Sequence, residues 1–387
     1  MRKKASASAK PGLSMRRALG LGWKSVILVS VLLGGLALLR VQQYSQATVY
    51  PYTVPLPRKS WVLSHQFSGN PKIAFLFLVR RNLPLDFVWE SFFENVDKAN
   101  YSVYVHSEPG FLFDESTTKS ALFVNRQLKN SIKVAWGEAS MIQAERLLFD
   151  EALRDPANQR FVLLSDSCVP LYNFSYIYNY LMVSPRSFVD SFLDKKDVRY
   201  NPKMSPTIPQ KKWRKGSQWV ALIRRHAEVV VDDEIVFPIF QNFCKRRPPA
   251  DPSKGRKNLK LQKQHNCIPD EHYVQTLLAM SDLESELERR TLTYTLWNQS
   301  TGNPENDAWH PFTFSYASSG PQDIKKIRGI NHVYYDTEFR TEWCSNNNQS
   351  VPCFLFARKF SQGAGMRLLS LGIVGNSEIS TLMDTQT

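Results

Sequence analysis

Two adjacent carboxylates occur where a helix is expected to begin, in the stretch Cys267-Ile-Pro-Asp-Glu-His-Tyr-Val-Gln-Thr-Leu-Leu278. Pro269 suits the first turn of a helix, where its missing N–H removes no hydrogen bond. Asp270 and Glu271 then lie beside backbone N–H groups without intrahelical partners, and the helix dipole favours their ionised form. An ionised carboxylate on a rigid element suits a general base, but acids in a first turn are also ordinary capping groups. The stretch alone favours capping.

The helix that follows these carboxylates has an apolar face that would fix it to a hydrophobic core. Tyr273, Val274, Leu277 and Leu278 recur at helical spacing, which predicts burial of that side.

Alternating strands and helices are expected to support this turn. Lys72–Val79 is a continuous apolar run of the kind found in buried parallel strands. A helix-like stretch covers Leu85–Ala99, and Ser140 with Gln143 forms a capping-box pattern at the start of a second helix. Further strands are predicted at Tyr101–His106, Ile132–Ala135, Phe161–Leu164, Ser187–Phe192, Trp219–Ile223 and Cys353–Ala357. This order predicts an α/β fold with a mainly parallel sheet flanked by helices, whose sites lie at the carboxyl ends of strands.

The N-terminal region has the pattern of a membrane signal anchor. Ser25 to Leu39 contains only Val, Ile, Leu and Ala interrupted by serines and glycines, and basic residues precede it. This predicts a cytosolic N-terminus and a translocated body, with a cleaved signal peptide as the alternative. The expected parts are a basic tail (1–22), a transmembrane anchor (23–40), a stem (41–70), a catalytic domain (71–370) and a C-terminal tail (371–387).

The formal net charge of +14 is unevenly distributed along the chain. Eight basic residues lie within residues 1–40, and the segments 195–215 and 245–263 each hold eight basic residues and one acid. The rest of the body is acidic, so a basic nucleic-acid-binding domain is not expected. The acidic run Asp232–Glu234 is interpreted as a solvated surface.

Five cysteines allow two disulfides and one free thiol. Cys344 and Cys353 bracket a polar loop, and Cys244 and Cys267 bracket the second basic segment. Cys168 lies in an apolar run and is interpreted as a buried small residue. Acceptor sequences for N-glycosylation occur at Asn100, Asn173, Asn298 and Asn348, and the first two adjoin apolar runs that favour ordered structure.

Several segments in the same order resemble the core-2/I-branching β-1,6-N-acetylglucosaminyltransferases, most closely their plant brittle-culm-like relatives. The chain lacks the GxGxxG, GxxxxGK[ST], HExxH and GxSxG signatures of other enzyme classes. The similar segments span roughly residues 70–370: Lys72–Val79, Tyr101–Glu108, Trp136–Ala144, Phe161–Pro170, Lys215–Trp219, Pro269–His272 and Phe354–Phe360.

The resemblance implies a GT-A fold and inverting transfer from a UDP-sugar to a glycan, without a bound metal or other cofactor. Glu271 matches the family's catalytic base, Lys359 its diphosphate-binding lysine and Ser217 a segment near the acceptor. Glu108 takes the place of an aspartate near the uracil. Ser165-Asp-Ser-Cys168 offers one carboxylate where metal-dependent GT-A enzymes have two. The resemblance also implies a Golgi type II membrane enzyme whose donor sugar is N-acetylglucosamine.

One departure from the family concerns the arginine that assists the lysine at the diphosphate. The matching segment is His310-Pro-Phe-Thr-Phe314, which contains no arginine. Arg340 is the preferred substitute and Arg328 a second, and otherwise the role falls to Lys359 with Arg358. Two alternatives stay open: a non-catalytic membrane-anchored protein that binds glycans or organises partners, and a transferase that uses another donor such as UDP-xylose.

Overall fold

The computed structural model describes residues 28–36, 38, 67–196, 198–247, 265–297, 311–346 and 349–375. The chain divides into two units, Met1–Val54 and Pro55–Thr387. In the first unit, residues 28–36 and 38 are helical. No helix within the described ranges is both long enough and apolar enough to cross a membrane. The predicted tail, residues 23–27, 37, 39 and 40 of the predicted anchor, and the stem up to residue 66 lie outside the described residues.

The second unit is built on a six-stranded sheet. In spatial order its strands are β2 (Tyr101–His106), β1 (Lys72–Leu78), β3 (Asn158–Ser165), β6 (Ala221–Ile223), β5 (Ser187–Phe188) and β7 (Leu287–Glu288). β1 is parallel to β2 and β3, and β5 is parallel to β7, but β6 is antiparallel to both neighbours. The sheet is therefore mixed but mainly parallel, as predicted: three of its five pairings are parallel, and only β6 runs opposite to the other strands. The connection from β5 to β6 contains only 3-10 turns, without the crossover helix that usually joins parallel strands.

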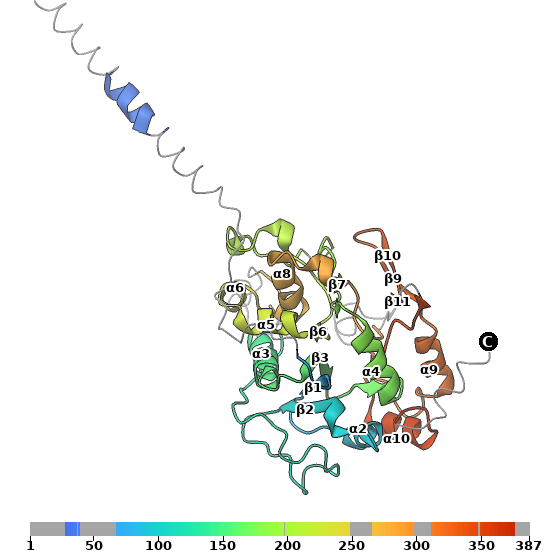
Figure 1. Ribbon diagram of the computed structural model, residues 1–387. Coiled ribbons are helices and arrows are strands. Elements are labelled where there is room, and N and C mark those ends of the chain that lie inside the picture. The colour runs from blue at the N-terminus through green and yellow to red at the C-terminus, as the bar shows by residue number, and fades with distance from the viewer. Residues whose placement is uncertain are drawn as a thin grey trace, which may run out of the picture. The chain divides into compact units, whose positions relative to one another are not determined.

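Helices cover both faces of this sheet (Figure 1). Alternate residues of β1 point into different cores: Phe75 and Phe77 into one, and Ala74 and Leu76 into the other. The first core includes α2 (Asp86–Phe93), α4 (Phe174–Val183), α9 (Pro321–Arg328) and α10 (Gln362–Ser370). The second includes α3 (Ser140–Leu153), α5 (Arg224–Asp232), α6 (Val236–Phe243) and α8 (Tyr273–Met280). The continuous apolar pattern of β1 thus reflects burial on both sides.

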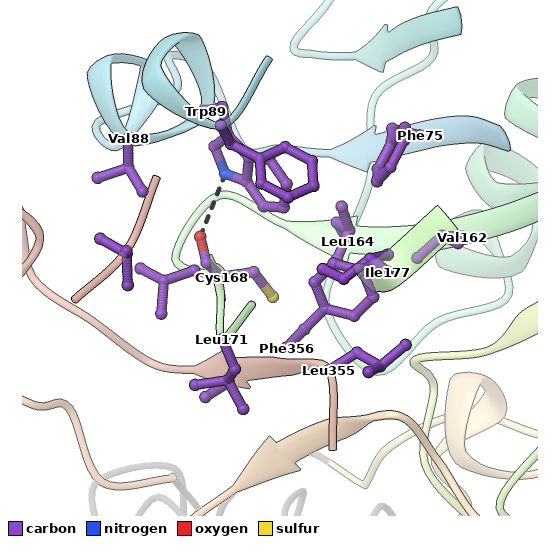
Figure 2. Close-up of a cluster of buried hydrophobic side chains, with 14 of the residues drawn as sticks. Phe75, Val88, Trp89, Val162, Leu164, Cys168, Leu171, Ile177, Leu355 and Phe356 are labelled. Atoms are coloured by element: carbon purple, nitrogen blue, oxygen red, sulfur yellow. Dashed lines mark hydrogen bonds between the residues drawn. The ribbon is translucent and has the colours of Figure 1, made fainter. Parts of the chain in front are cut away.

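The first core holds the end of β3 in place (Figure 2). The indole Nε1 of Trp89 donates a 3.2 Å hydrogen bond to the carbonyl of Cys168, just after β3. Cys168 is a buried free thiol, as predicted. Phe356 packs against the same indole ring, so the core also fixes a strand from the end of the chain.

That strand belongs to a second, three-stranded sheet in the order β4 (Val169–Pro170), β13 (Phe356–Arg358) and β8 (Thr293–Thr295). Two short hairpins pair β9 (His332–Tyr335) with β10 (Arg340–Trp343), and β11 (Ser345–Asn346) with β12 (Gln349–Ser350). The 3-10 turns are η1 (Lys98–Asn100), η2 (Pro202–Met204), η3 (Gln210–Lys212), η5 (Pro269–Glu271) and η6 (Glu284–Glu286). Because β13 pairs with β4, residues 358–360 lie beside the loop that follows β3.

Several predicted elements differ from the structure. Residues 132–135 form no strand, and the N–H of Ile132 instead donates to Nε2 of His106 at 3.1 Å. The helix predicted to Ala99 ends at Phe93, shortly before Asn95 takes a φ of 59°. Ser140 is the first residue of α3 and not its cap, since its hydroxyl accepts from the N–H of Ala135 at 3.0 Å. The strands predicted at 187–192, 219–223 and 353–357 are two or three residues long.

Both disulfides that the five cysteines allow are present. Cys244 pairs with Cys267, and Cys344 pairs with Cys353, with Cα–Cα distances of 5.0 and 5.2 Å. The first bridge lies immediately before η5, so it helps to fix the chain where the two adjacent carboxylates begin.

Candidate active site

The two carboxylates lie in a 3-10 turn and not in the α-helix itself. Pro269 is the first residue of η5, whose N-terminal position it can occupy without losing a hydrogen bond. The N–H groups of Glu271 and His272 donate to the carbonyls of Ile268 and Pro269 at 3.2 and 3.1 Å. α8 begins two residues later, and its predicted apolar face is buried. The turn is therefore held rigidly against the second core.

Glu271 is the more open of the two carboxylates. Its side chain is 26% exposed and forms an ion pair with the guanidinium of Arg199. Arg199 is itself buried, and its backbone N–H donates to a carboxylate oxygen of Asp194 at 2.8 Å. The indole of Trp213 donates to the same oxygen at 3.1 Å. Glu271 is thus fixed from one side and accessible from another.

Asp270 has the opposite environment. It is buried, and its Oδ1 has no hydrogen-bond partner in the described part of the chain. Burial raises the pKa of Asp270 to about 7, and the neighbouring charge of Glu271 acts in the same direction. Burial also raises the pKa of Glu145 well above its usual value, although a 2.7 Å hydrogen bond from Gln218 opposes the shift. Burial therefore favours the protonated form of two carboxyls near the turn, those of Asp270 and Glu145.

The segment around Ser217 is tied directly to the same turn. The N–H of Gly216 donates to the carbonyl of Glu271 at 2.9 Å, and the amide of Gln275 donates to the carbonyl of Ser217 at 2.7 Å. A Cβ on Gly216 would lie 1.7 Å from the carbonyl oxygen of Asp190, so only glycine fits. The N–H of Ser217 donates to Asp190 Oδ2 at 2.9 Å. The predicted base and the predicted acceptor segment are therefore neighbours.

Three cations gather where β1, β3 and β13 end. Arg80 follows β1 and donates to Asp166, which follows β3, at 3.3 Å. Lys359 follows β13, and burial lowers its pKa, with the positive charge of Arg358 acting in the same direction. Its ammonium forms no hydrogen bond or ion pair with a described residue. Three cations, Arg80, Arg358 and Lys359, lie near one carboxylate, that of Asp166. This part of the edge therefore attracts anions.

Arg358 connects this cationic edge with the carboxylate turn. Its guanidinium is 4.5 Å from the ring centroid of Trp219, and its Nε donates to the hydroxyl of Ser165 at 3.3 Å. Burial lowers the pKa of Arg358, whereas the charges of Cys168, Asp166 and Asp270 raise it. Arg358 is thus within electrostatic reach of Asp166 on one side and of Asp270 on the other.

Glu108 lies at the same edge of the sheet, after β2. Its carboxylate is 4.0 Å from Nε of Arg81, and both side chains are mostly exposed. β1 and β2 are paired up to Leu78 and His106, which places the residues after these strands side by side. Glu108, Arg80 and Asp166 therefore follow three adjacent parallel strands.

The arginines considered as partners of Lys359 lie elsewhere. Arg340 donates to Glu338 at 2.8 Å, to Glu342, and to the carbonyl of Ser191 at 3.2 Å. Arg328 donates to the backbone carbonyls of Leu171 and Ile373. Neither charge is among those that act on the pKa of Lys359, whereas those of Arg358 and Arg80 are.

The acidic run Asp232–Glu234 is not simply a solvated surface. Asp233 is buried, and its carboxylate accepts from the N–H groups of Val236 and Phe237 at the start of α6, both at 2.8 Å. It also accepts from the hydroxyl of Tyr273 at 2.8 Å. The prediction is therefore wrong for Asp233, which is a structural cap. Among the described residues, no group of three or more His, Cys, Asp or Glu side chains could hold a metal ion.

Two of the four glycosylation sequences can be placed. Asn173 caps α4, because its side-chain oxygen accepts from the N–H of Tyr176 at 3.0 Å. The side-chain oxygen of Asn100 accepts from Asn70 at 2.7 Å. Asn298 and Asn348 lie outside the described residues.

Comparison with known proteins gives the class of the chain. Residues 73–328 match the model of the Core-2/I-Branching enzyme family. The chain belongs to this family of glycosyltransferases, which confirms the resemblance. It is 52% identical over 318 residues to Glycosyltransferase BC10 of Oryza sativa subsp. japonica, covering 81% of this chain and 80% of that protein. A mixed α/β sheet flanked by helices fits the GT-A-like fold expected of the family.

Sequence reasoning missed three site residues. Arg80 follows the first strand directly, and its position at a carboxyl end was the available signal. Arg199 lies in the basic segment 195–215, and its contact with Glu271 spans 72 residues, which no local pattern indicates. Asp190 follows a short strand, and no local pattern distinguishes it.

Proposed function

We propose that the chain transfers a sugar from a UDP-sugar to a hydroxyl of a glycan acceptor, with inversion at the anomeric carbon. N-acetylglucosamine is the donor sugar that family membership favours. The observation that supports this most directly is the position of Arg358, whose charge interacts with Asp166 at the cationic edge and with Asp270, the residue before the rigid and partly exposed carboxylate Glu271. Such an arrangement supplies a base on one side and anion stabilisation on the other.

In this proposal Glu271 accepts the proton of the acceptor hydroxyl as its oxygen attacks the anomeric carbon. The bond from that carbon to the diphosphate oxygen breaks, and UDP leaves with its electron pair. Lys359, Arg358 and Arg80 neutralise the diphosphate, which revises the preference for Arg340. Positive side chains serve the role that a metal has in other GT-A enzymes, so no bound metal is required.

The other residues have supporting roles. Glu108, at the neighbouring strand end, is assigned to the uracil side of the donor. Ser217 is assigned to the acceptor, because its segment is hydrogen-bonded to the turn that carries the base. The basic N-terminus followed by an apolar run supports a Golgi type II membrane protein with a lumenal catalytic domain.

The test is substitution of the base. Glu271→Gln preserves the size of the side chain and one acceptor oxygen but cannot accept the proton, so transfer should fall by about 10²–10⁴-fold while UDP affinity stays within about twofold. Glu284→Gln, which alters a carboxylate paired with Arg214 outside the turn, is the matched control. Transfer by Glu271→Gln at the normal rate would show that another group is the base.

The alternative is a non-catalytic protein that keeps the fold to bind glycans or organise partners. Calorimetry with UDP and several UDP-sugars, including UDP-xylose, separates the two. Binding of none of them favours the non-catalytic alternative, and the tightest-binding sugar nucleotide identifies the donor.

A further inference from the structure

The hairpin β9–β10 has two faces of different chemistry. In the antiparallel register Tyr335 is opposite Arg340, Tyr334 opposite Thr341, and His332 opposite Trp343. Opposite residues share a face, and successive residues alternate. One face therefore holds Val333, Tyr335, Arg340 and Glu342, and the other holds His332, Tyr334, Thr341 and Trp343.

The first of these faces fastens the hairpin to the candidate active site. The hydroxyl of Tyr335 donates to Asp190 Oδ1 at 2.5 Å, while Asp190 Oδ2 accepts from the N–H of Ser217. Arg340 donates to the carbonyl of Ser191, and its guanidinium lies 4.1 Å from the ring centroid of Tyr335. The hairpin thus shares Asp190 with the predicted acceptor segment.

The turn of the hairpin adds a second attachment. The carboxylate of Glu338 accepts from the N–H of Leu193 at 3.1 Å and from Arg289 at 2.7 Å. The disulfide between Cys344 and Cys353 begins one residue after β10. The hairpin is therefore held in one position at the edge of the molecule (Figure 1), without needing a ligand to order it.

The second face is exposed and rich in aromatic rings. Tyr334 is 56% and Trp343 63% exposed, and Phe339 at the turn is 84% exposed. The ring centroids of His332 and Trp343 are 4.9 Å apart, so the rings lie next to one another along the ribbon. Exposed aromatic groups of this extent mark interaction sites more often than chance surface positions.

The chemistry of this face indicates the partner. It contains no Lys, Arg, Asp or Glu, so it lacks the cations that nucleic acid or an acidic lipid surface would require. Tyr and Trp rings offer a flat apolar surface with a polar edge. β-linked pyranose rings likewise have flat C–H faces bordered by hydroxyl groups. The partner with matching chemistry is a neutral sugar chain.

We propose that the exposed face of this hairpin, centred on Tyr334 and Trp343, is a binding site for a neutral β-linked oligosaccharide. Because the opposite face shares Asp190 with the acceptor segment, this site lies on the outer side of the same hairpin, where it would hold acceptor units beyond the one that reacts at Glu271. The proposal rests on the proposed transferase function. It specifies that the acceptor is an oligosaccharide and not a single sugar.

The test measures glycan affinity as a function of chain length. The full-length chain is titrated with neutral β-linked oligosaccharides of glucose, galactose or xylose, from one to six units. In at least one series, wild-type affinity should rise about tenfold from two units to six. The double variant Tyr334→Ala, Trp343→Ala should lose about tenfold in affinity for the hexamer, roughly threefold per ring, and keep its affinity for the dimer.

Three controls make the result specific. Trp343→Phe keeps a stacking ring and should retain most of the hexamer affinity. Met366→Ala removes another half-exposed apolar side chain, on α10, and should change nothing. UDP affinity and UDP-sugar hydrolysis should be unchanged in every hairpin variant, and these two readouts test the transferase function separately.

Length-independent affinity in all series, or a double variant that matches wild type, would overturn the proposal. So would a double variant that changes only the oligomeric state, because the face would then be a contact between copies of the chain. A different outcome is that the wild-type chain shows the length effect but neither binds nor hydrolyses any UDP-sugar. That outcome would contradict the proposed function, whereas glycan binding by the hairpin would be established.

Discussion

Asp270 and Glu271 are adjacent in the chain, but their surroundings give them different properties. Glu271 is paired with Arg199 and partly exposed, whereas Asp270 is buried with one oxygen unpartnered. Neighbouring carboxylates whose environments differ in this way commonly have separate roles. Glu271 has the access that a base requires, and Asp270 carries a cost of burial that a pH titration can measure.

Asp270→Asn should stabilise the chain at neutral and alkaline pH but not at acidic pH. The folded-state pKa of about 7 is above the unfolded value of 3.8, so the folded chain binds the proton more tightly. The stability from this carboxyl is complete below about pH 4 and is lost as pH rises through 7. Asparagine has no such dependence.

The difference in unfolding free energy between Asp270→Asn and wild type should therefore grow from pH 4 to pH 8, by at most about 4 kcal/mol. Chemical denaturation across this range measures it. The measurement compares the variant with wild type because two histidines also make stability depend on pH. Burial lowers the pKa of His106 to about 4 and of His272 to about 3, so these residues make both proteins more stable as pH rises. A constant difference would contradict the burial of a protonated Asp270.

Lys359→Ala should weaken UDP binding by about 10–100-fold, because a charge-assisted hydrogen bond contributes roughly 1.5–3 kcal/mol. Arg80→Ala should weaken it by a few fold, since the Arg80 side chain is 94% exposed and screened by solvent. Lys326→Ala on α9 is the control. UDP titration measures all three, and a chelator should leave transfer unchanged. A strict metal requirement would contradict neutralisation by side chains.

A residue's place in the fold could be predicted from sequence only where the residue lies in a local pattern, and the expected roles of Glu271 and Lys359 came from the family resemblance. Glu271 follows Pro269 at a helix start, and Lys359 follows a strand, so each could be placed before the fold was known. The contacts of Arg199 with Glu271 and of Tyr335 with Asp190 join residues 72 and 145 positions apart. Such contacts depend on the completed fold, and no spacing in the sequence indicates them.

The strands, too, could be predicted where the sequence pattern is local and could not where strand formation depends on residues distant in the sequence. β1, β2 and β3 are six to eight residues long and apolar, and their predicted positions were nearly correct. β5, β6 and β7 have only two or three residues, which is too short for a periodic pattern. They are strands because neighbours in space pair with them. The direction of β6, which makes the sheet mixed, is likewise a property of the whole sheet.

Removal of one disulfide tests how the start of η5 is held. Cys267 lies two residues before Pro269, and its N–H also donates to the carbonyl of Lys245 at 3.1 Å. The pair Cys244→Ser, Cys267→Ser frees a loop with a sequence separation of 23 and should cost about 3 kcal/mol of stability. UDP-sugar hydrolysis should fall as well, because the turn that carries Glu271 loses a support.

The second disulfide provides the comparison. Cys344→Ser, Cys353→Ser frees a loop with a separation of 9, so its cost should be similar, at just under 3 kcal/mol. This bridge lies beside the hairpin, and UDP-sugar hydrolysis should be retained at temperatures where the variant stays folded. Thermal unfolding and hydrolysis rates measure both pairs. Equal losses of hydrolysis would show that only global stability matters.

At the scale of the whole molecule, charge and cysteine chemistry are consistent with a body in an oxidising compartment. The two disulfides described above are the kind of bond that persists in the secretory pathway and is rare in the cytosol. Eight basic residues and no acid occur within residues 1–40, ahead of and around the apolar run. These features together support the proposed orientation, with the N-terminus cytosolic and the body lumenal.

Protease protection tests this orientation. In sealed microsomes that contain the full-length chain, the body should resist added protease and become digestible only when detergent opens the membrane. A type II anchor also retains the chain in the membrane fraction after alkaline extraction, whereas a cleaved signal peptide releases it. Digestion of the body without detergent would contradict the orientation itself.

Glycosylation gives a second readout of the same orientation, because the transfer of N-glycans occurs on the lumenal side. Asn173 should remain unmodified, since its side-chain oxygen caps α4 and the residue is half-buried. Modification is expected at Asn298 or Asn348, so adding Asn298→Gln and Asn348→Gln to an Asn100→Gln background should abolish the glycosidase-sensitive change in mass. A glycan on Asn173 would require the cap of α4 to be open when the chain is modified, and loss of that cap would cost about 1 kcal/mol.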